Sequence, residues 1–111
     1  MPELPSWRRP PGQRGGEFEG EAHGSGVSFF VIDNDPGRGP DLHRHPYSET
    51  FVVQAGTARF HLDGEEIDAS AGDVVVVKPG QVHGFKATGS EPVKMVGIHA
   101  APRFDTQWVE D

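Results

Sequence analysis

The 111-residue chain has no cysteine, which excludes disulfides and thiolate metal sites and leaves nitrogen and oxygen side chains as metal donors. No apolar run approaches the ~20 residues that cross a bilayer, and no basic segment followed by an apolar one opens the chain. Positive charge is also scarce. The net charge of −7 disfavours nucleic acid and anionic membranes as partners. We therefore expect a cytoplasmic protein with no nucleic-acid and no membrane partner.

Leucine and long uninterrupted segments are scarce too, which argues against helices. Three leucines stand against twelve valines and seven phenylalanines, a bias toward strand-forming side chains. From Val27 onward, no stretch without glycine or proline exceeds nine residues, too short for a three-turn helix. Asp63-Gly64 is typical of a type I′ hairpin turn. Short apolar runs alternate with turn signals at 27–33, 49–55, 57–62, 65–69, 73–77, 82–87 and 93–100. This pattern predicts a small all-β barrel.

The length allows one domain. Residues 1–26 contain four prolines and six glycines with few apolar side chains, and we predict a flexible N-terminal arm there. Trp7 and Phe18 are the exceptions and are candidates for docking onto the domain or onto a partner subunit. Residues 27–111 then form the β-barrel domain.

A cluster of histidine and glutamate is the feature that predicts chemistry. His43 and His45 are two residues apart, so in a strand they point to the same side. Glu49 opens the next run after a break at Pro46, and His83 opens a later one. Imidazole suits zinc, copper, iron and nickel, and an added carboxylate also suits iron or manganese. Three imidazoles and one carboxylate would leave open positions on a divalent cation, as catalytic metal sites do.

Glycine spacing places this cluster in a known family. Gly37, His43, His45, Glu49 and Gly56 fit G-x5-H-x-H-x3-E-x6-G, and Gly72, Gly80 and His83 fit G-x7-G-x2-H. The two patterns resemble the signature motifs of the cupin superfamily, whose members are jelly-roll-like antiparallel β-barrels. The span from Gly37 to His83 covers nearly half of the chain.

The resemblance implies that His43, His45, Glu49 and His83 hold one divalent transition metal ion: Fe, Mn, Ni or Zn. The sequence departs from the second motif at two positions. Lys78 stands at its usual proline and Ala87 at its terminal asparagine. Neither position is a metal ligand, so we expect metal binding to be kept.

Five further residues are predicted to line a substrate pocket beside the metal: Tyr47, Phe51, Phe60, Phe85 and His99. No arginine or lysine is evident at the inward positions of the ligand-bearing strands, as a phosphate substrate would require. We therefore predict a small apolar or enol-type organic substrate.

Cupins carry out many reactions, so the resemblance by itself cannot name one. Our leading prediction is a metal-dependent oxidoreductase of dioxygenase type in which Glu49 accepts a proton. One alternative is a metal-containing binding or sensor protein without turnover. Another is a lyase or isomerase that works by metal-assisted enolisation, with a base such as His99.

The resemblance also implies a homodimer, because many single-domain cupins pair through sheet edges and this chain has exposed edges to cover. The arm with Trp7 is a candidate contributor to the interface. We interpret the run Val74–Val77 as core or subunit interface.

Overall fold

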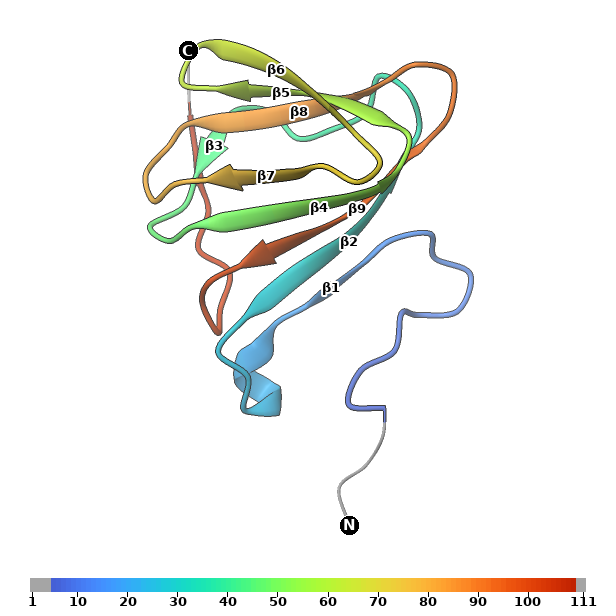
Figure 1. Cartoon of the computed structure of the whole chain (residues 1–111). Coiled ribbons are helices and arrows are strands. Elements are labelled where there is room, and N and C mark those ends of the chain that lie inside the picture. The colour runs from blue at the N-terminus through green and yellow to red at the C-terminus, as the bar shows by residue number, and fades with distance from the viewer. Residues whose placement is uncertain (1–4, 110–111) are drawn as a thin grey trace.

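The computed structural model describes residues 5–109 (Figure 1). Its strands form two antiparallel sheets of five, in the orders β1-β2-β9-β4-β7 and β10-β3-β8-β5-β6. The elements are β1 (Gly16–Phe18), the 3-10 helix η1 (Gly20–His23), β2 (Ser28–Asn34), β3 (His43–Arg44), β4 (Glu49–Ala55), β5 (Thr57–Leu62), β6 (Glu65–Ser70), β7 (Val74–Val77), β8 (His83–Thr88), β9 (Val93–His99) and β10 (Gln107–Trp108). The predicted all-β, jelly-roll-like class is confirmed. Within residues 5–109, strand pairing stays inside each sheet, so the sheets form a sandwich and not a hydrogen-bonded closed barrel.

The seven apolar runs predicted from the sequence coincide with β2 and β4 to β9 to within one residue at each end. Asp63 and Gly64 connect β5 to β6 with φ of 48° and 85°, the positive values that a type I′ turn requires at both central residues. The turn and the strand alternation together fix which face of each strand is buried.

The core lies between the two sheets. On β4 the side chains of Glu49, Phe51 and Val53 are buried and alternate with less buried neighbours. The ring of Phe51 meets that of Phe60 on β5 at 5.0 Å, in an edge-on arrangement that joins the sheets. Burying a side chain of this size stabilises the fold by roughly 1.5–3 kcal/mol. The alternation therefore places Glu49 on the same inward face as the aromatic core.

Gly56 shows why one of the motif positions must be glycine. It connects β4 to β5 with a φ of 74°, and a Cβ there would lie 2.4 Å from the carbonyl oxygen of Pro92. A side chain would be strained by the backbone angle and would clash with backbone atoms. The motif glycine thus permits the tight turn that follows the ligand-bearing strand.

Part of the N-terminal segment is ordered in the sheet. β1 pairs with β2, and the Trp7 ring packs edge-on against Phe18 at 6.2 Å and Phe29 at 5.5 Å. A flexible arm was predicted because a three-residue strand among prolines and glycines leaves no periodic pattern. A boundary at residue 26 stays a prediction, and residues 1–4 lie outside the described part of the chain.

An ion pair ties the same segment to the end of β2. The Arg14 guanidinium lies 2.9 Å from Asp33 Oδ1 and 2.8 Å from Asp35 Oδ1.

In the part of the chain that the structure describes, no helix is long and apolar enough to span a membrane. The predicted cytoplasmic location stays a prediction.

Candidate metal centre

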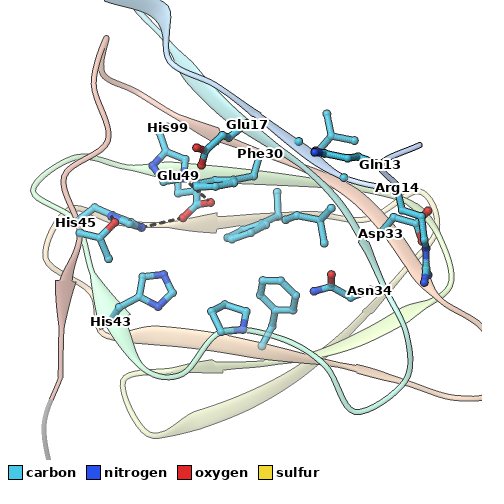
Figure 2. A pocket seen from close by; sticks show the side chains of 18 of the residues that line it. Gln13, Arg14, Glu17, Phe30, Asp33, Asn34, His43, His45, Glu49 and His99 are labelled. Carbon is cyan, nitrogen blue, oxygen red and sulfur yellow. Dashed lines mark hydrogen bonds and ion pairs between the residues drawn. The ribbon is translucent and has the colours of Figure 1, made fainter. Parts of the chain in front are cut away.

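Strand register brings the histidines and the glutamate together from both sheets. His43 on β3 lies directly opposite His83 on β8, and Glu49 at the start of β4 lies directly opposite His99 at the end of β9. His45 follows β3 by one residue, and all five side chains are buried. The sequence-predicted ligands therefore meet at one end of the sandwich. Figure 2 shows His43, His45 and Glu49 with His99 beside them.

Each of the three predicted histidine ligands is oriented by a backbone carbonyl. A carbonyl oxygen can only accept a hydrogen bond, so Nδ1 of each ring carries the hydrogen and Nε2 of the neutral ring keeps its lone pair. Histidines that bind metals are usually fixed by such a partner. The Nδ1–carbonyl pairs are His43 with Asp41 (2.7 Å), His45 with Asp105 (2.8 Å) and His83 with Gln81 (2.9 Å).

The Glu49 carboxylate completes the set. Its Oε1 lies 3.2 Å from Nε2 of His45 and 3.3 Å from Nε2 of His83. One ligand atom from each of the four residues, His43 included, lies within 4.8 Å of the others. Metal–ligand bonds of about 2.0–2.2 Å fit a donor set of this size. The four side chains can therefore hold a divalent transition metal ion, as predicted.

Electrostatics favour the metal-binding forms of Glu49 and His43, whereas His45 holds a proton more tightly. Burial raises the pKa of the Glu49 carboxyl, but contacts with His45, His83 and His99 outweigh burial and hold that pKa well below its usual range. Burial lowers the pKa of His43. Burial also opposes the charged form of His45, yet its contacts with Glu49 and Asp105 together outweigh burial and raise the His45 pKa. At neutral pH the carboxylate is ionised and the His43 ring is neutral, as metal ligation requires.

A cavity of about 920 Å³ opens beside the cluster. His43, His45, Glu49 and His99 line one end, and Gln13, Arg14, Asp33 and Asn34 line the other (Figure 2). Between them the lining includes the rings of Phe30, Phe51 and Phe85. The cavity therefore runs from the metal donors along an aromatic wall to a polar end.

Three of the five predicted pocket residues line this cavity: Phe51, Phe85 and His99. Tyr47 and Phe60 are not among its lining residues. Phe60 points inward but lies deeper, with its ring 5.0 Å from Phe51 and 5.4 Å from Phe85. Tyr47 stacks on the His45 ring at 5.1 Å. Strand parity predicts the inward face of Phe60 but not its depth, and Tyr47 lies between β3 and β4, where strand parity does not apply.

Sequence reasoning missed several residues of the site. Phe30 was missed because the residues around it are apolar at successive positions, so no alternation shows which face of the strand points inward. Arg14 and Glu17 line the cavity from the segment predicted as an arm, and no sequence pattern indicates this. Trp7, predicted as a candidate for docking, lines it as well. Gly97 lies beneath the Glu49 carboxylate, and a glycine within a strand was a signal of such close approach.

The comparisons with known proteins agree with this geometry. Residues 30–99 match the family of the cupin domain. An oxalate-binding protein of Thermotoga maritima is 26% identical over 77 residues, which are 68% of this chain and 64% of that protein. A protein of Streptomyces cyaneus named polyketide synthase CurC is 37% identical over 68 residues, which are 60% of this chain and 44% of that protein. The chain thus spans about half of the length of these curated relatives.

A solved structure shows the same fold over nearly the whole chain. It is an uncharacterised conserved protein with a double-stranded β-helix domain from Klebsiella pneumoniae, 29% identical to this chain, with a TM-score of 0.75. The match covers 93% of this chain and 90% of that one. Because the family match includes all four predicted ligands and most of both sheets, the chain belongs to the cupin family.

Proposed function

We propose that this cupin is a metal-dependent oxidoreductase of dioxygenase type that acts on a small apolar or enol-type organic substrate. His43, His45, Glu49 and His83 would hold one divalent ion, Fe, Mn, Ni or Zn. The ion would supply Lewis acidity and a binding place for the substrate oxygen. The pocket beside these residues would bind and orient the rest of the substrate.

The pocket lining is the observation that carries this proposal. The rings of Phe30, Phe51 and Phe85 favour a flat apolar molecule next to the ligand cluster. Arg14 is the one arginine or lysine among the described lining residues, and two aspartates already neutralise it. The relative from Thermotoga maritima binds oxalate, but a small dianion would find no free positive side chain here. A cavity of about 920 Å³ is also in the range of sites for organic ligands larger than oxalate.

Glu49 is the proposed proton acceptor. Its low pKa makes it a weak base, so it would take a proton only from a hydroxyl group that the metal has made more acidic. Such a hydroxyl is present in an enol or a phenol and absent from a simple hydrocarbon. The acidity of Glu49 therefore supports the enol-type class of substrate.

Oxygen uptake tests the reaction. The protein is stripped with a chelator, reloaded separately with Fe²⁺, Mn²⁺, Ni²⁺ or Zn²⁺, and supplied with a panel of aromatic enols and catechols, with oxalate as the comparison. We expect oxygen consumption with at least one enol and none with oxalate. Ligand binding without oxygen uptake would favour the binding or sensor alternative. Proton exchange at carbon without oxygen uptake would favour the isomerase or lyase alternative, and either result contradicts the proposal.

We also propose that the chain forms a homodimer through the outer face of the sheet β1-β2-β9-β4-β7. Strand register aligns Val31, Val96, Val52 and Val74 in one apolar row across four strands. In the Val74–Val77 run, Val75 and Val77 are buried in the core, whereas Val74 is 58% and Val76 54% exposed. A second copy of this face would cover the exposed valines. Because the row contains only valines, its burial would not bring charged side chains together.

A further inference from the structure

His99 is a buried polar side chain that the metal ligand set does not use. It lies at the end of β9, next to Glu49, and its Nε2 is 3.0 Å from Glu49 Oε2. That distance suits a hydrogen bond, but the angle does not, and Nε2 has no other hydrogen-bond partner among the described residues. Leaving a buried N–H unpaired costs about 1–3 kcal/mol. The Glu49 carboxylate is the acceptor within reach.

The other nitrogen of His99 is held by Tyr47. The Tyr47 hydroxyl oxygen is 2.6 Å from His99 Nδ1 and accepts a hydrogen bond from the backbone N–H of Asp105 at 3.0 Å. The Tyr47 ring is itself fixed, because it stacks on His45 with only 5° between the planes. The hydroxyl hydrogen therefore remains free to be donated to Nδ1.

These contacts select one form of the His99 ring. With the Tyr47 hydroxyl as donor, Nδ1 accepts and Nε2 of the neutral ring carries the hydrogen, which faces the carboxylate. The opposite form would place the Nε2 lone pair 3.0 Å from an ionised carboxylate oxygen, which is repulsive. For His45 and His83 a bound metal ion would take up the Nε2 lone pair, but His99 is outside the ligand set. The ionised Glu49 and the Tyr47 hydroxyl thus require the same form.

We infer that Tyr47 and His99 form a positioning chain for Glu49. His99 holds Oε2 of the carboxylate, and Oε1 stays directed toward Nε2 of His45 and His83. In this arrangement neither nitrogen of His99 has a free lone pair, so His99 orients a metal ligand and does not serve as the base of an enolisation. The inference rests on the metal centre proposed above and does not depend on which reaction the protein performs.

Metal affinity tests the chain without any assay of activity. Binding of Zn²⁺ to the chelator-stripped protein is measured by calorimetry in competition with a chelator, for the natural protein and for His99→Leu, His99→Gln and Tyr47→Phe. We expect His99→Leu to weaken binding about 10–100-fold, as loss of a partner of a metal ligand commonly does. His99→Gln keeps an N–H donor and should retain most of the affinity. Tyr47→Phe keeps the ring and should weaken binding by about tenfold or less.

Two controls separate positioning from general damage to the fold. His61→Gln changes a half-exposed histidine on β5, outside the site, and should bind Zn²⁺ like the natural protein. In a Glu49→Gln background, His99→Leu should add little further loss, because the residue it acts through has been changed. Unchanged affinity in His99→Leu, or equal losses in His99→Gln and His99→Leu, would overturn the positioning role. Failure of the natural protein to bind any of the metals would instead overturn the metal centre.

Discussion

Gly97 on β9 lies directly opposite Phe51 on β4, and the space that a side chain at Gly97 would fill is occupied from the neighbouring strand. A Cβ at this position would lie 2.6 Å from Glu49 Oε2 and 3.0 Å from Cε1 of the Phe51 ring. The Glu49 carboxylate thus packs directly against the backbone of Gly97. Both the packing of Phe51 and the orientation of Glu49 therefore require that residue 97 has no side chain.

Gly97→Ala should lower metal affinity while leaving the fold in place. The added methyl group forces the Glu49 carboxylate away from its position, and the carboxylate can move because it ends a flexible side chain. We expect at least a tenfold weaker Zn²⁺ affinity, similar to the loss of a partner of a ligand. Gly26→Ala is the matched control, because a Cβ there meets nothing within 4 Å. Equal affinities in the two variants would contradict the role given to Gly97.

Removing two ligands should abolish metal binding. The purified natural protein should carry close to one divalent ion per chain, and His43→Ala combined with His83→Ala should carry none, measured by elemental analysis without a histidine tag. Because a metal that binds only the folded state stabilises it, added Zn²⁺ should raise the Tm of the natural protein and not that of the double variant. Full occupancy in the double variant would show that the ion is held elsewhere.

The two neighbouring histidines should titrate on opposite sides of the ordinary histidine pKa of about 6.5. Contact with Glu49 raises the pKa of His45, and burial lowers that of His43. In the metal-free protein, NMR titration of the ring carbons should place the His45 midpoint above and the His43 midpoint below this value. Protons compete with metal for Nε2. As the pH is lowered, metal affinity should therefore start to decrease while the pH is still above 6.5, because His45 takes up its proton first. Glu49→Gln should bring the His45 midpoint down, and an unchanged midpoint would contradict the assigned cause.

The pH dependence of stability follows from the same two shifts. For His43 the pKa is lower in the folded chain than in the unfolded chain. Below about pH 6.5 the unfolded chain therefore binds the proton more readily, and the free energy of unfolding decreases. For His45 the folded chain holds the proton more tightly, so its contribution is present below about pH 6.5 and is lost as the pH rises through the folded pKa. Urea unfolding of the metal-free protein should therefore show opposite changes in pH dependence for His43→Gln and His45→Gln. Parallel changes would contradict the two directions.

The strands and the clustering of the four candidate ligands could be predicted from the sequence because each leaves a local signal. Turn residues such as Asp63-Gly64 separate the runs, and the spacing of His43, His45 and Glu49 is carried by a single stretch of chain. The remaining parts of the site depend on contacts between distant segments. Tyr47 meets His99 across 52 positions, and Arg14 meets Asp35 across 21. No pattern within either segment indicates its partner.

The shortest strands were not predicted from the sequence for a related reason. β3 and β10 have two residues each, and they pair with each other at His43 and Trp108. Two residues are too few to show the alternation that identifies a strand. Their pairing nevertheless places β10 beside the candidate metal centre, and the backbone carbonyl of nearby Asp105 accepts the hydrogen bond from His45. The geometry of the ligands therefore depends on elements that only the structure shows.

Lysines in place of the two exposed valines of β7, Val74 and Val76, should dissociate the proposed homodimer. The natural protein should have the mass of two chains in light scattering at micromolar concentration, because an exposed apolar row of this kind is stable when a second copy covers it. Val74→Lys together with Val76→Lys places two buried, unpaired charges per chain in the interface, which opposes association strongly. The double variant should therefore be a monomer with an unchanged fold, since both side chains are more than half exposed in the single chain. Val27→Lys, a comparably exposed valine that precedes β2 and lies outside the row, should remain a dimer. A natural protein with the mass of one chain, or a Val74→Lys and Val76→Lys variant that stays dimeric, would assign the interface elsewhere.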